Sequence, residues 1–204
     1  MTGARTLRLC RMISFSLFLA TLLVASLLFA GHLQATVAQD KWEAADNSVV
    51  RLSPTAFPRL PKDIVDYLSV HNCEVPQPFD ATESTNVISG EFMRRGQLDW
   101  AVMCSRNRTS SILVFRGGSN KDVAAIAEVP DSDFLQTIDG NGTIGFSRQI
   151  SAVKKDYILQ RYRWYGGPKP PHMDHQGIDD GFNGKASTVF FYYHGRWLRL
   201  QGAD

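Results

Sequence analysis

The stretch from Asn86 to Phe115 constrains the fold more than any other part of the sequence. It contains three apolar runs, Val87-Ile88, Trp100 to Cys104 and Ile112 to Phe115, which polar residues and a glycine separate. Short runs rich in Val, Ile, Phe and Trp, with turn-forming residues between them, are typical of neighbouring antiparallel strands. We therefore expect a β-meander here, within a mainly antiparallel α+β domain.

The length and composition allow one domain with a substantial core. The chain has 204 residues, of which 44% are hydrophobic and 21% charged, values that are ordinary for a globular protein. Three arginines and no carboxylates lie in the first 38 residues, so the rest has 22 − 3 = 19 basic and 20 acidic side chains, a net charge of −1. Such a chain does not bind polyanions through bulk charge, and we expect no nucleic acid partner.

A hydrophobic leader precedes this domain. The last of the three arginines, Arg11, is followed by the apolar run Met12 to Ala30 and then by small residues that end in Thr36-Val37-Ala38. This pattern predicts a signal peptide over residues 1–38 that is cleaved before Gln39. The run of 19 residues is also long enough for an uncleaved membrane anchor. Either outcome predicts that the domain is exported to the periplasm or the extracellular space, with membrane contact only if the leader stays uncleaved.

The two cysteines outside the leader predict a disulfide. Cys73 and Cys104 remain once Cys10 is assigned to the leader, and neither belongs to a CxxC motif. An even pair in an oxidising compartment favours a disulfide over a metal-bound or reactive thiol.

The sequence before the meander predicts a linker and a helix. Residues 39–58 contain two prolines and no sustained periodicity, so we expect a linker there. Proline is favoured in the first turn of a helix, and a helix that begins at Pro61 places Ile64 and Leu68 on one side. We expect this helix to pack on the sheet within a single globular domain over residues 59–204, with Cys73 joining its end to the strand of Cys104.

The sequence after the meander predicts mostly strands. Alternation favours a strand over a short helix at residues 123–129, and two Asx-Gly pairs within residues 139–142 are typical of a hairpin turn. Ile178 to Phe182 are expected to form one helical turn. Further strands are predicted over residues 146–153, 157–165, 187–193 and 196–201.

Part of the meander resembles a known repeat. Gly90-Glu91-Phe92 and Gly96 to Val102, within the 13 residues from Gly90 to Val102, resemble the FG-GAP repeat of integrin-type β-propellers, in which a Gly-Asp-Phe start, a calcium loop and an Asp-x-Ala-Val strand follow one another. The resemblance implies a strand-loop-strand shape. It does not imply bound calcium, because Arg94 and Arg95 occupy the loop where the family has oxygen ligands, and the further repeats of a propeller are missing.

A cluster of histidines and carboxylates lies between Pro171 and Asp180. Its members are His172, Asp174, His175 and Asp179, which are side chains of the types that hold zinc. The cluster predicts a metal-dependent hydrolase as an alternative function. A polar loop whose Asp and His residues cap a short helix explains the same residues, and no HExxH motif is present.

Cations and aromatic rings alternate from Arg161 to Tyr165, as they do in surfaces that bind glycans or single-stranded nucleic acid. In the strand that we expect here, Tyr162 and Trp164 share one face, and Arg161, Arg163 and Tyr165 share the other. The first pair then belongs to the core and the arginines to a solvated edge. The surface alternative makes Arg161, Arg163, Trp164 and Tyr165 the candidate contacts for a protein or glycan ligand.

Other motifs exclude common enzyme classes. Gly140 to Gly145 has the spacing GxGxxG, but a strand rather than a helix is expected after it, which argues against a dinucleotide site. No GxSxG nucleophile motif occurs. We therefore expect an exported, non-enzymatic binding or interaction domain with no cofactor, acting at the cell envelope or outside the cell. The alternatives are a metal-dependent hydrolase that uses residues 172–180 and a structural component of the envelope.

Overall fold

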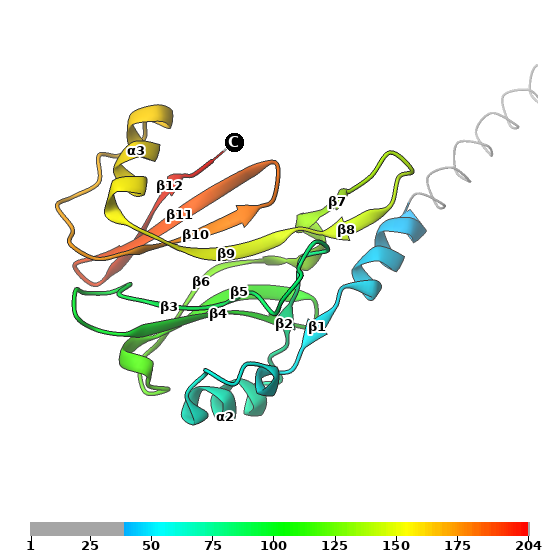
Figure 1. The fold of residues 1–204 in the computed structure, drawn as a ribbon, viewed down its shortest axis with the longest axis horizontal. Coiled ribbons are helices and arrows are strands. Elements are labelled where there is room, and N and C mark those ends of the chain that lie inside the picture. The colour runs from blue at the N-terminus through cyan, green and yellow to red at the C-terminus, as the bar shows by residue number, and fades with distance from the viewer. Residues whose placement is uncertain (1–38, 204) are drawn as a thin grey trace, which may run out of the picture. The chain divides into compact units, whose positions relative to one another are not determined.

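The computed structural model describes residues 39–203. Contacts within the chain divide it into two units, Met1–Glu43 and Ala44–Asp204, and apart from the helical residues 39–43 the elements below belong to the second unit. That unit contains two four-stranded antiparallel sheets (Figure 1). The predicted signal peptide, residues 1–38, and its cleavage site lie outside the described residues.

The first large sheet is the expected meander. Its strands follow one another in the order β3 (Val87–Gly90), β4 (Asp99–Arg106), β5 (Thr109–Phe115) and β6 (Val123–Pro130). The prediction of strands from Asn86 to Phe115 is therefore confirmed, and residues 123–129 form a strand rather than a helix. The pairing of β5 with β6 shifts by one residue beyond Ser110, at a bulge where Ala127 has a φ of 56°.

The second large sheet is a meander in the C-terminal half of the chain. It pairs β9 (Arg148–Val153), β10 (Gly177–Phe182), β11 (Ala186–Tyr193) and β12 (Arg196–Gln201), with β9 and β12 at its edges. The last two strands confirm the predicted hairpin at the C-terminus. The helical turn expected at residues 178–182 is wrong, because this segment pairs with a strand on each side as β10.

Helix α3 (Lys155–Tyr165) occupies the segment expected to be a strand over residues 157–165. That prediction is wrong because it followed the aromatic content of the segment. Asp156 lies in the first turn, where a negative charge stabilises a helix, and Gly166 follows the last residue with a φ of 75°. Ile158 is fully buried and fixes one side of α3 to the second sheet.

The domain has four layers, in the order helix, sheet, sheet, helix (Figure 1). Helix α2 (Lys62–Val70) buries Ile64 and Leu68 against one face of the first sheet, as the sequence predicted. The opposite face of that sheet packs on the second sheet, and α3 covers the outer face of the second sheet. Successive residues of β4 therefore enter different cores: Val102 packs on the α2 side and Met103 between the sheets.

Two small sheets and three 3₁₀ helices complete the unit. β1 (Arg51–Leu52) pairs with β2 (Val75–Pro76), and β7 (Leu135–Thr137) pairs with β8 (Ile144–Phe146). The hairpin of β7 and β8 confirms the turn predicted at residues 139–142. The 3₁₀ helices are η1 (Pro54–Ala56), η2 (Arg116–Gly118) and η3 (Asp131–Phe134).

The segment expected to be a linker contains regular structure. Residues 39–48 are helical, and β1 and η1 follow within residues 39–58. The compact unit begins at Ala44, so it includes most of this segment. Phe57 explains the difference, because its side chain is buried in the core between α2 and the first sheet.

Two further connections hold the layers together. The predicted disulfide joins Cys73, just after α2, to Cys104 on β4, with Cα atoms 5.3 Å apart. Asn86 links the two large sheets: its side chain donates to the Arg148 carbonyl at 3.1 Å and accepts from the Ile150 N–H at 3.0 Å. The start of the first meander is thereby fixed to the edge strand β9 of the second sheet.

Candidate binding groove

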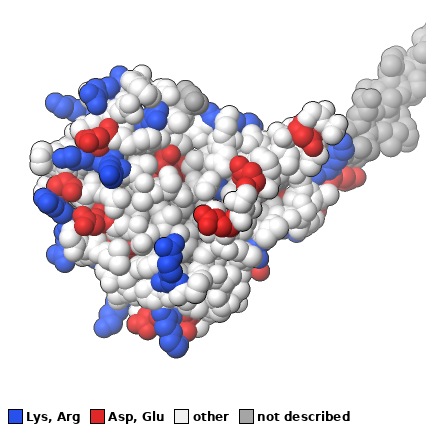
Figure 2. Space-filling view, viewed as in Figure 1, with Lys and Arg blue, Asp and Glu red and all other residues white. Residues whose placement is uncertain are grey.

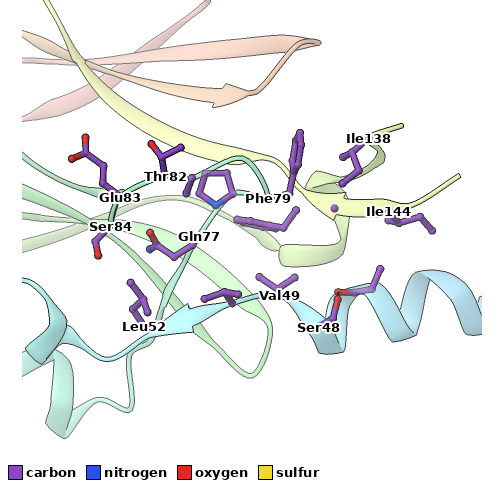
Figure 3. A pocket seen from close by; sticks show the side chains of 16 residues that line it. Ser48, Val49, Leu52, Gln77, Phe79, Thr82, Glu83, Ser84, Ile138 and Ile144 are labelled. Atoms are coloured by element: carbon purple, nitrogen blue, oxygen red, sulfur yellow. Dashed lines mark hydrogen bonds between the residues drawn. The ribbon is translucent and has the colours of Figure 1, made fainter. Parts of the chain in front are cut away.

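A groove of about 450 Å³ lies between the β7–β8 hairpin and the chain segment that enters the domain (Figure 3). One wall contains Val49, Val50 and Leu52, and the other contains β8. The connection from Gln77 to Ser84 closes one side. The lining residues are Ala45, Ser48, Val49, Val50, Leu52, Gln77, Pro78, Phe79, Ala81, Thr82, Glu83, Ser84, Ile138, Ile144, Gly145 and Phe146.

The side chain of Gln77 holds the irregular connection in place. Its Oε1 accepts from the Thr85 N–H at 2.8 Å, and its Nε2 donates to the Val75 and Thr85 carbonyls, each at 3.1 Å. These bonds close a loop of the chain around a buried amide. The apolar side chains that this loop presents to the groove therefore lie on a fixed backbone, although no ladder of strand bonds supports them.

Strand β8 exposes a free edge to the groove. The Ile138 N–H donates to the Thr143 carbonyl at 2.8 Å, so Thr143 bonds toward β7. Because bonding direction alternates along an antiparallel strand, the N–H and C=O groups of Ile144 and Phe146 face away from β7. On that side the Phe79 N–H donates to the Phe146 carbonyl at 2.7 Å. Among the described residues no strand pairs with this edge, and the backbone of Ile144 has no partner there.

Charge is sparse along the groove. Glu83 is the one charged side chain among its lining residues, and it is exposed and forms no ion pair within the described part of the chain. The face drawn in Figure 2 has acidic and basic side chains interspersed, without a broad field of one sign. The groove therefore suits a ligand that makes both apolar and polar contacts, with positive charge near Glu83.

The predicted contact residues on α3 are only partly brought together. The guanidinium carbon of Arg161 lies 4.3 Å from the ring centre of Tyr157 and 4.9 Å from that of Trp164. Trp164 is 62% exposed, whereas Tyr162 packs on the core under α3. The expectation that Tyr162 and Trp164 share a face is wrong, because residues two apart on a helix point in nearly opposite directions.

The other predicted contacts on α3 lie at its exposed end. Arg163 and Tyr165 are both exposed, and the Arg163 Nε donates to the Leu159 carbonyl within the same helix at 3.3 Å. Arg161 and Trp164 thus form a stacked pair, and Arg163 lies outside it.

The predicted metal ligands are dispersed. His172 and Asp174 are exposed, whereas His175 is buried with its Nδ1 2.9 Å from the Gln176 carbonyl oxygen. Within residues 39–203 there is no group of three or more His, Cys, Asp or Glu side chains placed to hold a metal ion. The zinc site of the alternative function stays a prediction.

Asp179 lies apart from the histidines, in contact with α3. The Tyr157 hydroxyl donates to Asp179 Oδ2 at 3.2 Å, while Oδ1 is shielded from solvent and has no donor among the described residues. Burial raises the pKa of Asp179, and the Ser187 and Tyr157 hydroxyls and the Arg161 guanidinium offset only part of that effect. Burial, followed by the Asp179 charge, likewise raises the pKa of Tyr157.

The segment that resembles an FG-GAP repeat has the strand-loop-strand shape. Its strands β3 and β4 pair in antiparallel fashion, and Gly90 lies opposite Asp99. The Asp99 carboxylate is buried and accepts four hydrogen bonds. Its donors are the backbone N–H groups of Phe92, Met93 and Gly117 and the side chain of Gln97, at 3.0, 2.9, 2.8 and 2.6 Å. This carboxylate therefore organises the loop through protein donors.

The groove was not predicted from the sequence. Its lining comes from three segments that are far apart in the chain, and most of its residues lie outside regular elements. The available signal was the presence of apolar residues, such as Val49 and Phe79, in segments without periodicity.

Comparisons with known proteins identify no relative. No model of a protein family, no curated protein and no solved structure matches this chain. Among the described helices, none has the length and apolar character needed to cross a bilayer.

Proposed function

We propose that this protein is an exported, non-enzymatic binding domain and that the groove beside β8 is its ligand site. The observation that carries the proposal is the combination of a concave lining, in which apolar residues outnumber polar ones, with an unpaired strand edge. Binding sites are typically concave and apolar, with a few polar groups that orient the ligand. Here Glu83 and the backbone of Ile144 are such groups.

The disulfide supports export. Structural disulfides persist in oxidising compartments and are rare in the cytosol of most organisms. The bond between Cys73 and Cys104 connects α2 to the first sheet, so it belongs to the core of the domain. Intact-mass analysis of the protein from its compartment tests this assignment, with Gln39 expected as the first residue and a mass about 2 Da below that of the reduced chain.

A matched pair of variants tests the groove. Val50 and Val70 are both exposed, at 60% and 78%, but only Val50 lines the groove. Nile red, a neutral apolar dye, should bind protein produced from the full chain, and V50D should weaken that binding at least tenfold because a charge then enters the apolar lining. V70D, on α2, should leave it within twofold. Equal effects of the two variants would show that the groove is not the site.

The stacked pair on α3 favours a second contact surface, for a protein or glycan. Trp164 is largely exposed and rests against the Arg161 guanidinium, and aromatic and Arg side chains are enriched in interfaces. A glycan array probed with protein from the full chain and with its W164A variant tests this second candidate. Signals that are lost in W164A support it, and signals that persist there contradict it.

A further inference from the structure

We propose that the groove binds an extended segment of a partner protein, which adds a strand to the free edge of β8. This inference rests on the proposed function and names the class of ligand. A strand edge is a row of N–H and C=O groups that another extended chain can pair with, and strand addition is a common mode of peptide recognition.

The backbone of β8 favours a peptide over a lipid. The N–H and C=O of Ile144 face the groove without a partner in the described structure, and an acyl chain cannot bond to either of them. Leaving such groups unpaired as a ligand covers them costs free energy, whereas an extended peptide supplies both an acceptor and a donor. The Phe79 N–H already occupies the Phe146 carbonyl, so an incoming strand pairs with the edge of β8 at Ile144.

The side-chain surroundings set the sequence pattern of the segment. Val49, Val50 and Leu52 line the groove beside β8, so one face of the incoming strand contacts apolar residues. The lining also includes the exposed polar residues Ser48 and Thr82. Because side chains alternate between the faces of a strand, the segment requires apolar residues at every second position.

Glu83 defines the charge of the segment. It is the one acidic group of the lining, and no basic residue of the groove neutralises it. A Lys or Arg in the segment gains an ion pair there, whereas an acidic residue meets repulsion. The ligand class is therefore an extended, alternating apolar and polar segment with a basic residue.

A synthetic peptide tests this inference. The probe is a labelled, capped nonapeptide in which Val and Thr alternate and the central Thr is replaced by Lys, with binding followed by fluorescence anisotropy. Binding to protein from the full chain is expected, with at least tenfold weaker binding when Glu replaces the Lys. The E83K variant should reverse this order of preference. Equal binding of both peptides to both proteins would contradict the assigned role of Glu83.

Methylation of the peptide backbone separates strand addition from apolar contact. Two further probes carry N-methyl groups on the Val residues or on the Thr residues. In an added strand, only one of these sets faces β8, so one probe should bind at least tenfold more weakly than the other. If both methylated probes lose the same binding affinity, strand addition is wrong. Strand addition is also wrong if oleate displaces Nile red from the protein and no peptide binds.

Ile144 provides the matched protein variants. I144P removes the N–H that faces the groove but no hydrogen bond of the β7 ladder, since proline is tolerated on a strand edge. It should abolish peptide binding, while I144V, which keeps the N–H, should bind within threefold of the wild type. In the wild-type protein, saturating peptide should slow hydrogen exchange of the Ile144 amide at least tenfold, a readout that needs no variant to fold.

The outcomes separate this inference from the function on which it rests. If V50D weakens Nile red binding but no peptide binds, the groove is a ligand site and strand addition is wrong. If V50D and V70D affect the dye equally, the proposed function itself is wrong.

Discussion

Arg148 and Asp180 form a bidentate ion pair inside the protein, with Nε to Oδ1 and Nη2 to Oδ2 distances both 2.8 Å. Arg148 is fully buried, yet every N–H of its guanidinium has an acceptor. The remaining donors reach the carbonyl and hydroxyl oxygens of Ser110 on β5 and the carbonyl of Ala127 on β6. The left-handed backbone at Ala127 is part of the bulge in β6, so the irregular strand supplies a bond between the sheets.

Removing the charge of Asp180 should strongly destabilise the domain. In D180N the Arg148 guanidinium stays buried without a counter-charge, and breaking such a pair costs about 3–5 kcal/mol. Urea unfolding followed by circular dichroism measures the difference in the free energy of unfolding. The control is D122N, which breaks the exposed pair of Arg116 and Asp122 and should cost less than about 1 kcal/mol. Equal losses in both variants would contradict the structural role of the buried pair.

The disulfide should contribute about 3–4 kcal/mol to stability. It joins residues 31 positions apart, and cross-links of this span stabilise mainly by restricting the unfolded chain. A variant with both C73A and C104A should lose this amount in urea unfolding. Reductant should destabilise the wild type to the same degree and leave the double variant unchanged. A wild type whose stability does not respond to reductant would contradict this contribution.

Asp179 should make the domain less stable as the pH rises. Burial raises the pKa of its carboxyl above the unfolded value of about 3.9. The folded protein thus holds this proton more tightly, and the resulting stability is complete below the unfolded pKa and is lost as the pH rises through the folded pKa. D179N stays neutral, so as the pH rises above about 4 its free energy of unfolding should rise relative to the wild type.

The control for this measurement is D174N, which removes the same charge from an exposed position. The charged and titratable groups around Asp179 are Tyr157, Arg161 and Asp180, and all three are present in both variants. The free energies of unfolding of D179N and D174N should diverge as the pH rises. If the free energies of unfolding of D179N and D174N depend on pH in the same way, the buried carboxyl of Asp179 does not contribute to the pH dependence of stability.

The zinc alternative predicts bound metal, and we expect the protein to contain much less than one zinc ion per chain. His172 and Asp174 are exposed, and Asp179 bonds to Tyr157 rather than facing them. Catalytic zinc needs about three protein ligands at one point. Inductively coupled plasma mass spectrometry measures the content. One equivalent of zinc that is lost in the H172A and H175A double variant but kept in H194A would instead support the hydrolase.

Local sequence signals predicted the first meander, α2, the C-terminal hairpin and the disulfide. In each case neighbouring residues carry the information: β-branched and aromatic runs for β4 and β11, a proline and an apolar stripe for α2. The prediction of the disulfide required only the number of cysteines outside the leader and the assumption that the compartment is oxidising.

Tertiary contacts decided the elements that were predicted wrongly. The aromatic residues of α3 favour a strand locally, but burial of Ile158 against the second sheet favours the helix. Two aspartates make β10 a poor strand on its own, and Asp180 is tolerated because Arg148, 32 residues away, pairs with it. The groove is less predictable still, because its walls come from segments whose proximity only the complete fold creates.

The helices on the outside of the two sheets restrict how this protein can meet other molecules. A partner that approaches either broad side encounters helix α2 or α3, in whose interior the backbone groups bond within the helix. A partner that bonds to the backbone can therefore do so only at the edges of the two packed sheets. The side that α2 covers remains free for fusions or labels, so a reporter attached through α2 should not obstruct ligand binding at the groove.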